Sequence, residues 1–246
     1  MRIALAQIAL EMGNVTENRR AIFGALQAAA RGGADLVVFP ECSLAGWLAS
    51  NAAAAAQPVS GPFLSALRRA AVKLRLHIAV GFEERAGGAI YNSALLISNR
   101  GDRLLRHRKI HELELAHSLY SRGKSLSVAS LGNTGCALAI CADNWTPDLG
   151  RALISMGARL ILSPCAWAVE PGREARNLRW IQARYRALLK NSEAFVVAVN
   201  CVGAVTEGPW RGKIFQGDSL VAGPGGKILF QGPRRQPGVF FFDLTP

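Results

Sequence analysis

Short apolar runs alternate along the first part of the chain with longer segments in which apolar and polar residues recur at helical spacing. The runs Arg2–Gln7, Asp35–Pro40 and His77–Phe82 have the length of strands, and the segments Asn14–Arg31 and Gly61–Arg75 between them have the length of helices. Strands that alternate with helices are typical of layered α/β domains. The pattern therefore predicts an α/β fold.

Two further runs, Tyr91–Ser98 and Arg103–Arg108, flank the turn-forming residues 99–102 and indicate a hairpin, so part of the sheet system is antiparallel. Residues 136–140, 159–163, 195–200, 213–221, 227–231 and 239–243 are predicted as strands, and residues 147–156 and 171–191 as helices. No linker or repeat divides the chain, so a single domain over residues 1–246 is expected.

Composition excludes several classes of protein. No apolar run reaches the roughly 18 residues that span a bilayer, and the N-terminus lacks the pattern of a secretory signal peptide. A cytoplasmic protein with no membrane partner is therefore expected. The formal charge of +12 favours acidic partners or substrates. However, the basic residues are dispersed and no nucleic-acid-binding motif accompanies them, so no nucleic-acid partner is expected.

The five cysteines are odd in number and scattered, which predicts reduced thiols available for packing or chemistry. Four of them lack the full set of reactive partners and are interpreted as packing residues, with Cys42, beside Glu41, as the first exception to consider. These four are Cys42, Cys136, Cys165 and Cys201.

Reactive side chains follow three of the predicted strands. The strands that start at residues 36, 104 and 137 end at Glu41, Lys109 and Cys141. Strand ends at one edge of a layered α/β fold are where functional groups gather. These three residues are therefore the candidate catalytic set.

A cysteine attacks as its thiolate, so it needs a base or a nearby positive charge. Glu41 is the candidate base and Lys109 the candidate charge. The chain is expected to turn from strand into helix after Cys141, so the N–H of Ala142 and the Lys109 ammonium form the predicted oxyanion site. The composition alone leaves the alternative open that these are ordinary packing and surface residues.

Several short motifs surround these residues in a fixed order. They are Ile3–Gln7, Gly33–Glu41, Tyr91–Ala94, Arg108–His111, Ile140–Asp143 with Pro147, Gly157-Ala158, Leu160–Pro164, Asn200 with Gly203, and Phe215–Ser219. The chain thereby resembles the nitrilase superfamily of carbon–nitrogen hydrolases, in its amidase-like branch, over nearly its whole length.

The resemblance implies a four-layer αββα sandwich that needs no metal and no organic cofactor. It assigns Glu41 as general base, Cys141 as nucleophile and Lys109 as the stabiliser of the tetrahedral intermediate. Many relatives also carry a second glutamate before a glycine, and counting back from Gly123 reaches Ala116. A short deletion would place Glu114 in that role, which makes Glu114 the candidate substrate-binding glutamate.

Other side chains have competing interpretations. Trp145 and Trp167 follow strand ends and are candidate pocket residues, although a tryptophan is often only a packing body. The arginines at 173, 176 and 179 either meet an acidic substrate or form a solvated helix face. His107 and His111 have the spacing of metal ligands on a helix, but no further ligand set accompanies them, so local hydrogen bonding is expected.

The expected function is hydrolysis of a small-molecule amide, an ω-amide or an N-carbamoyl compound, through a cysteine thioester. The resemblance also implies a homodimer or larger homo-oligomer. Two alternatives remain open. One is an acyltransferase or nitrilase that uses the same Glu-Lys-Cys site, and the other is a non-catalytic binding or regulatory protein, for which Ala116 is the only hint.

Overall fold

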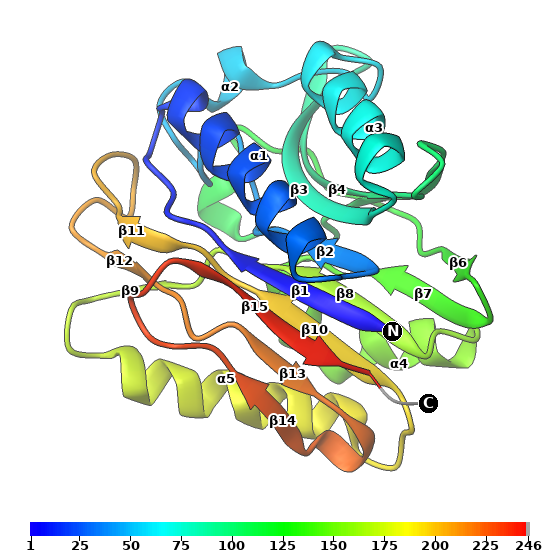
Figure 1. Cartoon of the computed structure of the whole chain (residues 1–246). Helices are drawn as coiled ribbons and strands as arrows, with labels where there is room; N and C mark the ends of the chain where they lie inside the picture. Colours follow the sequence, from blue (N-terminus) through cyan, green and yellow to red (C-terminus); the bar gives the residue numbers. More distant parts are fainter. Residues whose placement is uncertain (245–246) are drawn as a thin grey trace.

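Two six-stranded sheets stack face to face and carry helices on their outer faces (Figure 1). The structure is a computed structural model and describes residues 1–244. One hydrophobic cluster joins the first sheet to helices α1 and α3, and another fills the space between the sheets and reaches α4 and α5. The predicted four-layer αββα sandwich is confirmed.

The first sheet is mixed, because its inner strands are parallel and its hairpin and edge strands are antiparallel. In spatial order its strands are β15 (Gly238–Asp243), β1 (Arg2–Gln7), β2 (Leu36–Val38), β3 (His77–Ala86), β4 (Ala89–Ile97) and β5 (Arg103–Arg108). The hairpin predicted from residues 91–108 is formed by β4 and β5.

The second sheet has a parallel centre, in which β8 lies between β7 and β10. In spatial order its strands are β14 (Ile228–Gln231), β13 (Leu220–Ala222), β10 (Phe195–Val199), β8 (Leu160–Pro164), β7 (Thr134–Leu138) and β6 (Val128–Leu131). A small third sheet consists of β11 (Val202–Ala204), β12 (Ile214–Gln216) and β9 (Ala168–Val169).

Helices α1 and α3 cover the outer face of the first sheet, and α4 and α5 cover that of the second. The helices are α1 (Val15–Arg31), α2 (Ala52–Ala55), α3 (Pro62–Leu74), α4 (Pro147–Ser155) and α5 (Glu174–Leu189), with 3-10 turns η1 (Glu114–Ala116), η2 (Cys141–Asn144) and η3 (Pro224–Gly226). No helix within residues 1–244 is long and apolar enough to cross a membrane.

Strand β1 shows why the layers stack in this way. Ile3 and Leu5 point into the core between the sheets, whereas Ala4 and Ala6 point to the helices on the outer face. All four side chains are fully buried, because a central strand has no solvent face in this architecture. Small alanines on one side let α1 approach the sheet closely.

Two predicted elements differ from the structure. The single strand predicted over 213–221 is two strands, because Gly217 and Asp218 adopt positive φ angles of 70° and 55° that interrupt the extended chain. The helix predicted from residue 171 begins only at Glu174, after a turn in which Gly172 has a φ of 87°.

Candidate active site

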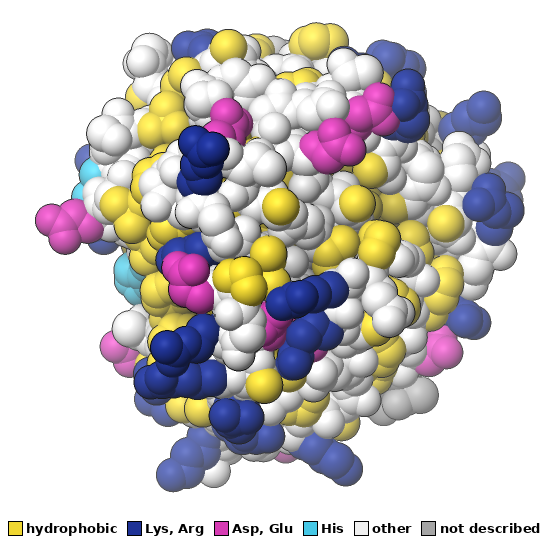
Figure 2. Space-filling view, turned by 90° about the vertical axis from the view of Figure 1, so that its left-hand side faces the viewer, with side chains coloured by type: hydrophobic (Ala, Val, Ile, Leu, Met, Phe, Trp, Pro, Cys, Tyr) yellow, Lys and Arg dark blue, Asp and Glu magenta, His cyan; other side chains and the backbone are white. Residues whose placement is uncertain are grey.

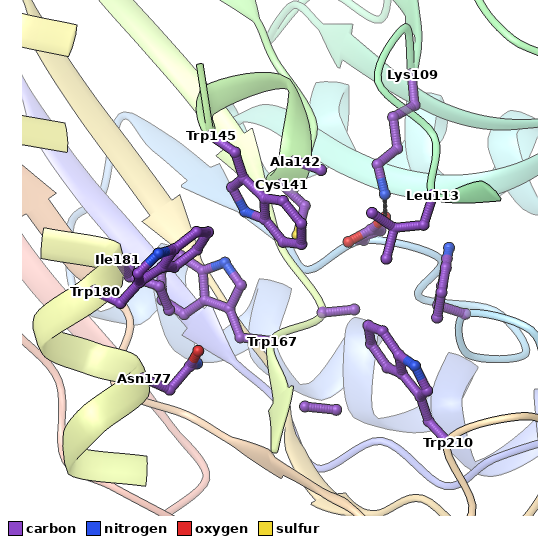
Figure 3. Close-up of a pocket in the computed structure, with 14 residues that line it drawn as sticks. Lys109, Leu113, Cys141, Ala142, Trp145, Trp167, Asn177, Trp180, Ile181 and Trp210 are labelled. Carbon is purple, nitrogen blue, oxygen red and sulfur yellow. Dashed lines mark hydrogen bonds and ion pairs between the residues drawn. The ribbon is translucent and has the colours of Figure 1, made fainter. Parts of the chain in front are cut away.

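Three strand ends meet at one edge of the sandwich. Glu41 follows β2, Lys109 follows β5 directly, and Cys141 follows β7 at the start of η2. Backbone hydrogen bonds hold two of these ends in place, from Glu41 N–H to the carbonyl of Cys165 at 3.2 Å and from Lys109 N–H to the carbonyl of Asn92 at 2.8 Å. The structure brings the three predicted residues into one cavity (Figure 3).

A buried ion pair lies at the centre of this site. The Lys109 Nζ is 2.7 Å from Oε1 of Glu41, and the two residues expose only 2% and 1% of their surface. Burial by itself would lower the pKa of Lys109, but the negative charges of Glu41 and Glu112 outweigh it and raise the pKa well above its ordinary value. Lys109 is therefore an ammonium ion throughout the neutral range.

Glu112 is a second carboxylate beside Lys109. Its Oε1 lies 3.2 Å from Lys109 Nζ and accepts a hydrogen bond from Trp47 Nε1 at 3.2 Å. Asn92 bridges the two carboxylates, since its Nδ2 donates to Glu41 at 2.6 Å and to Glu112 at 3.0 Å. One ammonium and one amide thus hold two acidic side chains in fixed positions.

The prediction that Glu114 is the substrate-binding glutamate of the site is wrong. Glu114 begins the turn η1, is exposed and does not line the cavity. Glu112 instead supplies a second carboxylate to the site, with its Oε1 3.2 Å from Lys109 Nζ.

Cys141 stands in a strained backbone conformation. Its φ is +46°, a region that non-glycine residues rarely occupy. A hydrogen bond with the thiol of Cys165, followed by burial and the charge of Glu41, raises the pKa of Cys141 well above its ordinary value. The resting side chain is consequently a thiol, and it needs a base before it can attack.

Asp143 braces the turn that carries Cys141. Its Oδ1 accepts the N–H groups of Ile110 and His111, at 3.0 and 2.8 Å, and its Oδ2 accepts that of Ile140 at 3.0 Å. Oδ2 also lies 2.7 Å from His107 Nε2. These contacts join the Lys109 segment to the Cys141 segment, and they give His107 the local hydrogen bond that the sequence predicted.

Ala142 lines the cavity next to Cys141. It is the second residue of η2, and the first N–H groups of a helix have no partner inside that helix. Such groups bind developing negative charge when they face a reacting carbonyl. That the Ala142 N–H forms an oxyanion site stays a prediction.

The cavity has a volume of about 270 Å³ and is lined mostly by apolar residues. All five tryptophans of the sequence line it, namely Trp47, Trp145, Trp167, Trp180 and Trp210. Trp145 and Trp180 pack edge to face with their ring centroids 5.2 Å apart, and Trp47 and Trp210 lie 4.3 Å apart. In Figure 3, Trp145, Trp167 and Trp180 lie to one side of the cavity and Trp210 lies to the other.

Comparison with known proteins agrees with this fold. The family model for carbon–nitrogen hydrolases matches residues 2–246. An (R)-stereoselective amidase from Pseudomonas sp. is 31% identical over 235 residues, which are 95% of this chain and 81% of that protein. A 2-oxoglutaramate amidase from Bacillus subtilis is 26% identical over 82% of this chain and 75% of its own length.

An amidase from Nesterenkonia sp. AN1 has a similar fold, with a TM-score of 0.82 and 24% identity over 100% of this chain and 93% of that one. The chain belongs to the carbon–nitrogen hydrolase family. It is therefore an enzyme of the nitrilase superfamily that acts on non-peptide C–N bonds, as the sequence predicted.

Several residues of the site were not singled out from the sequence. Asn92 lies within the motif Tyr91–Ala94, and a polar amide on an otherwise apolar strand was the sequence feature that could have indicated its role. Trp47 and Trp180 come from a loop and a helix with no chemical motif, and only the fold places them at the cavity. Trp145 and Trp167 line the cavity where the sequence placed them.

Proposed function

We propose that this protein is an amidase that hydrolyses a small-molecule amide through a thioester on Cys141. Glu41 is the general base, and Lys109 with the Ala142 N–H binds the oxyanion. The observation that carries the proposal is the buried contact of 2.7 Å between Lys109 and Glu41 in the same cavity as the Cys141 thiol. A base and a fixed positive charge beside one thiol are what nucleophilic acyl transfer requires.

In the first half of the reaction, Glu41 accepts the proton of the Cys141 thiol as Sγ attacks the amide carbon. The negative charge that develops on the substrate oxygen is stabilised by the Lys109 ammonium and the Ala142 N–H. The C–N bond then breaks, the protonated Glu41 returns its proton to the leaving nitrogen, and ammonia or an amine departs. The acyl group remains on sulfur as a thioester.

In the second half, Glu41 takes a proton from water, whose oxygen attacks the thioester carbon. The second tetrahedral oxyanion uses the same two donors. Its collapse breaks the C–S bond, releases the carboxylic acid and returns the proton to Cys141. Burial raises the pKa of Glu41 from its ordinary value, and this makes it a better proton acceptor than an exposed carboxylate.

Glu112 and Asn92 hold Glu41 and Lys109 in place rather than exchange protons with the substrate. Both contact the catalytic pair directly and neither lines the cavity. We propose them as positioning residues. Ala116 was the only hint of a non-catalytic protein, and the carboxylate that Glu112 places against Lys109 argues against that alternative.

The test is release of ammonia from small aliphatic amides, compared between the wild type and two variants. Cys141→Ala is expected to abolish release. Cys136→Ala is the matched control, because Cys136 is a buried thiol on β7 that does not line the cavity, and its activity should stay close to wild type. Equal activity of Cys141→Ala and wild type would refute the proposed nucleophile.

The same assay separates the alternative reactions. An acyltransferase would form a new amide when an acceptor amine is added, and a nitrilase would prefer nitriles to amides. We further propose a single domain, a cytoplasmic location and a homo-oligomer, which rest on the sequence and on the family resemblance. Sedimentation of the purified protein tests the last of these.

A further inference from the structure

A second hollow lies against the catalytic cavity. The two share Ala168, Asn177 and Trp180 as lining residues. The second hollow, of about 330 Å³, is lined in addition by Val169, Glu170, Arg173, Arg176 and Lys213. A molecule held at Cys141 can therefore extend past Trp180 into this outer hollow.

The outer hollow is positively charged. Arg173 is the N-cap residue of α5 and Arg176 lies in the first turn, and both side chains line the outer hollow. Lys213 also lines the outer hollow, and its ammonium lies 4.6 Å from the centroid of the Trp210 ring. Glu170 is the only acidic residue that lines the outer hollow within residues 1–244, against three cations.

None of these three cations forms an ion pair with an acidic side chain in the part of the chain that the structure describes. They are available to a bound anion. In Figure 2, Lys and Arg side chains gather near the centre and at the lower left of the face shown, with hydrophobic side chains exposed between them.

The inner cavity has the opposite character. Its one ammonium, Lys109, is already neutralised by Glu41 and Glu112, and the tryptophans supply mainly apolar surface. A carboxylate bound there would lose its hydration and lie close to Glu41, which is unfavourable. An anionic group can be accommodated in the outer hollow but not next to the reacting amide.

The size of the inner cavity suits one aromatic ring. A closed apolar cavity of about 150 Å³ holds benzene, so about 270 Å³ leaves room for a ring and a carboxamide. Trp145 and Trp180 already pack edge to face, and a substrate ring can continue that packing.

We propose that the preferred substrates are amides with an aromatic body next to the scissile group and a carboxylate at the far end. The ring lies among the tryptophans, and the carboxylate lies between Arg173, Arg176 and Lys213. This inference rests on the proposed amidase function and names its substrate class. It also predicts that short ω-amido acids are poor substrates, because their carboxylate cannot reach the outer hollow.

The test compares matched amides. 3-(4-Carboxyphenyl)propanamide and 3-phenylpropanamide differ only in the distal carboxylate, and succinamate and butyramide supply the short charged and short neutral cases. The wild type is expected to show the highest kcat/KM with the carboxylated aromatic amide and the lowest with succinamate. Added NaCl should reduce the advantage of the carboxylated amide, because the cations are exposed.

Variants of the arginines test whether the outer hollow causes the preference for the carboxylated amide. Arg173→Gln combined with Arg176→Gln is expected to raise KM for the carboxylated aromatic amide roughly three- to tenfold, and to leave kcat and the neutral amide unchanged. Arg179→Gln is the control, because Arg179 is exposed on the same helix and lines neither hollow. It should change neither substrate.

Equal kcat/KM for the two aromatic amides, or the same KM effect from Arg179→Gln, would overturn the proposed anion site. Faster hydrolysis of butyramide than of either aromatic amide would overturn the aromatic preference while leaving the amidase function intact. Absence of hydrolysis with all four amides would count against the amidase function itself, and the substrate class would fall with it.

Discussion

The Lys109 ammonium lies 2.7 Å from the Glu41 carboxylate, although 68 residues separate the two in the chain. Both side chains are buried, and Glu112 contacts the same ammonium at 3.2 Å. The arrangement holds a base and a positive charge in position before any substrate arrives. Preorganised charge of this kind lowers the barrier because little rearrangement is needed during the reaction.

Replacing Glu112 should move the pH dependence of the reaction. In the proposed mechanism Glu41 must be ionised, so kcat/KM falls as the pH drops through the pKa of Glu41. The negative charge of Glu112 raises that pKa. Glu112→Gln removes the charge, so the acidic limb of the kcat/KM profile should shift to lower pH.

Glu114→Gln is the control for this shift, since Glu114 lies in the same segment but is exposed and outside the cavity. Its acidic limb should coincide with that of the wild type. An acidic limb that stays in place or moves to higher pH in Glu112→Gln would show that Glu112 does not raise the pKa of the base.

Asp143→Asn should destabilise the fold and lower activity together. Burial would raise the pKa of Asp143, but hydrogen bonds and charge from His107 and the N–H of His111 outweigh it, so the pKa is lowered. The stabilisation is therefore present above the ordinary pKa of aspartate and is lost as the pH falls through the lowered value. Removing one partner of a buried pair costs roughly 3–5 kcal/mol.

Chemical denaturation at pH 7 and at pH 3 measures this contribution, and the deficit of Asp143→Asn should be smaller at pH 3, which lies below the ordinary pKa of aspartate. Asp148→Asn, at an exposed position on α4, is expected to unfold like the wild type. A deficit of the same size in both variants would mean that the contacts of Asp143 are not its source.

Glu83→Gln should stabilise the protein at alkaline pH. Glu83 is fully buried on β3, its Oε2 has no hydrogen-bond partner, and burial raises its pKa from 4.5 to about 7. The folded state therefore binds a proton that the unfolded state releases between pH 4.5 and 7, so stability falls as the pH rises through this window. The full penalty above pH 7 is about 3 kcal/mol.

Thermal unfolding of wild type and Glu83→Gln at pH 5 and pH 8 tests this. The Tm of the variant relative to wild type should be higher at pH 8 than at pH 5. The exposed Glu193→Gln provides the baseline and should show no such difference. A relative Tm of Glu83→Gln that does not change between the two pH values would argue against a buried neutral carboxyl group.

Gly81→Ala should reduce activity by displacing Glu41. A Cβ at Gly81 would lie 2.5 Å from the carbonyl oxygen of Pro40 and 2.6 Å from the Cα of Glu41, which is too close for either backbone atom. A shift of about 1 Å in a catalytic group costs roughly 100-fold in rate. We expect kcat/KM to fall roughly 10- to 100-fold.

Gly24→Ala serves as the comparison, because Gly24 lies on the exposed side of α1 and a Cβ there meets no atom within 4 Å. It should keep full activity and gain roughly 0.5–1 kcal/mol of stability from improved helix propensity. Retention of wild-type activity by Gly81→Ala would mean that the Glu41 segment adjusts without moving its carboxylate.

Features that depend only on short segments of the chain could be predicted from the sequence alone. Strand β2 and the strand-helix turn at Cys141 are short segments with strong hydrophobic and turn signals, so their ends could be assigned without the fold. Because strand ends at one edge of a sheet are neighbours in space, Glu41, Lys109 and Cys141 could be grouped in advance. The order of their motifs also identified the family.

Contacts between side chains from distant segments of the chain could not be predicted in this way. Glu112 rather than Glu114 reaches Lys109 because of the path that the chain takes after β5, and no periodicity reports that path. Trp180 reaches the cavity only because α5 packs beside η2.

The sequence by itself determined the αββα class, the three residues at the strand ends and the family, since each depends on local pattern and motif order. The tertiary structure decided which carboxylate accompanies Lys109, that five distant tryptophans share one cavity, and that Arg173 and Arg176 line the hollow next to it. The physical reason is that these contacts join segments far apart in the chain, and only the packing of the layers sets the distances between them.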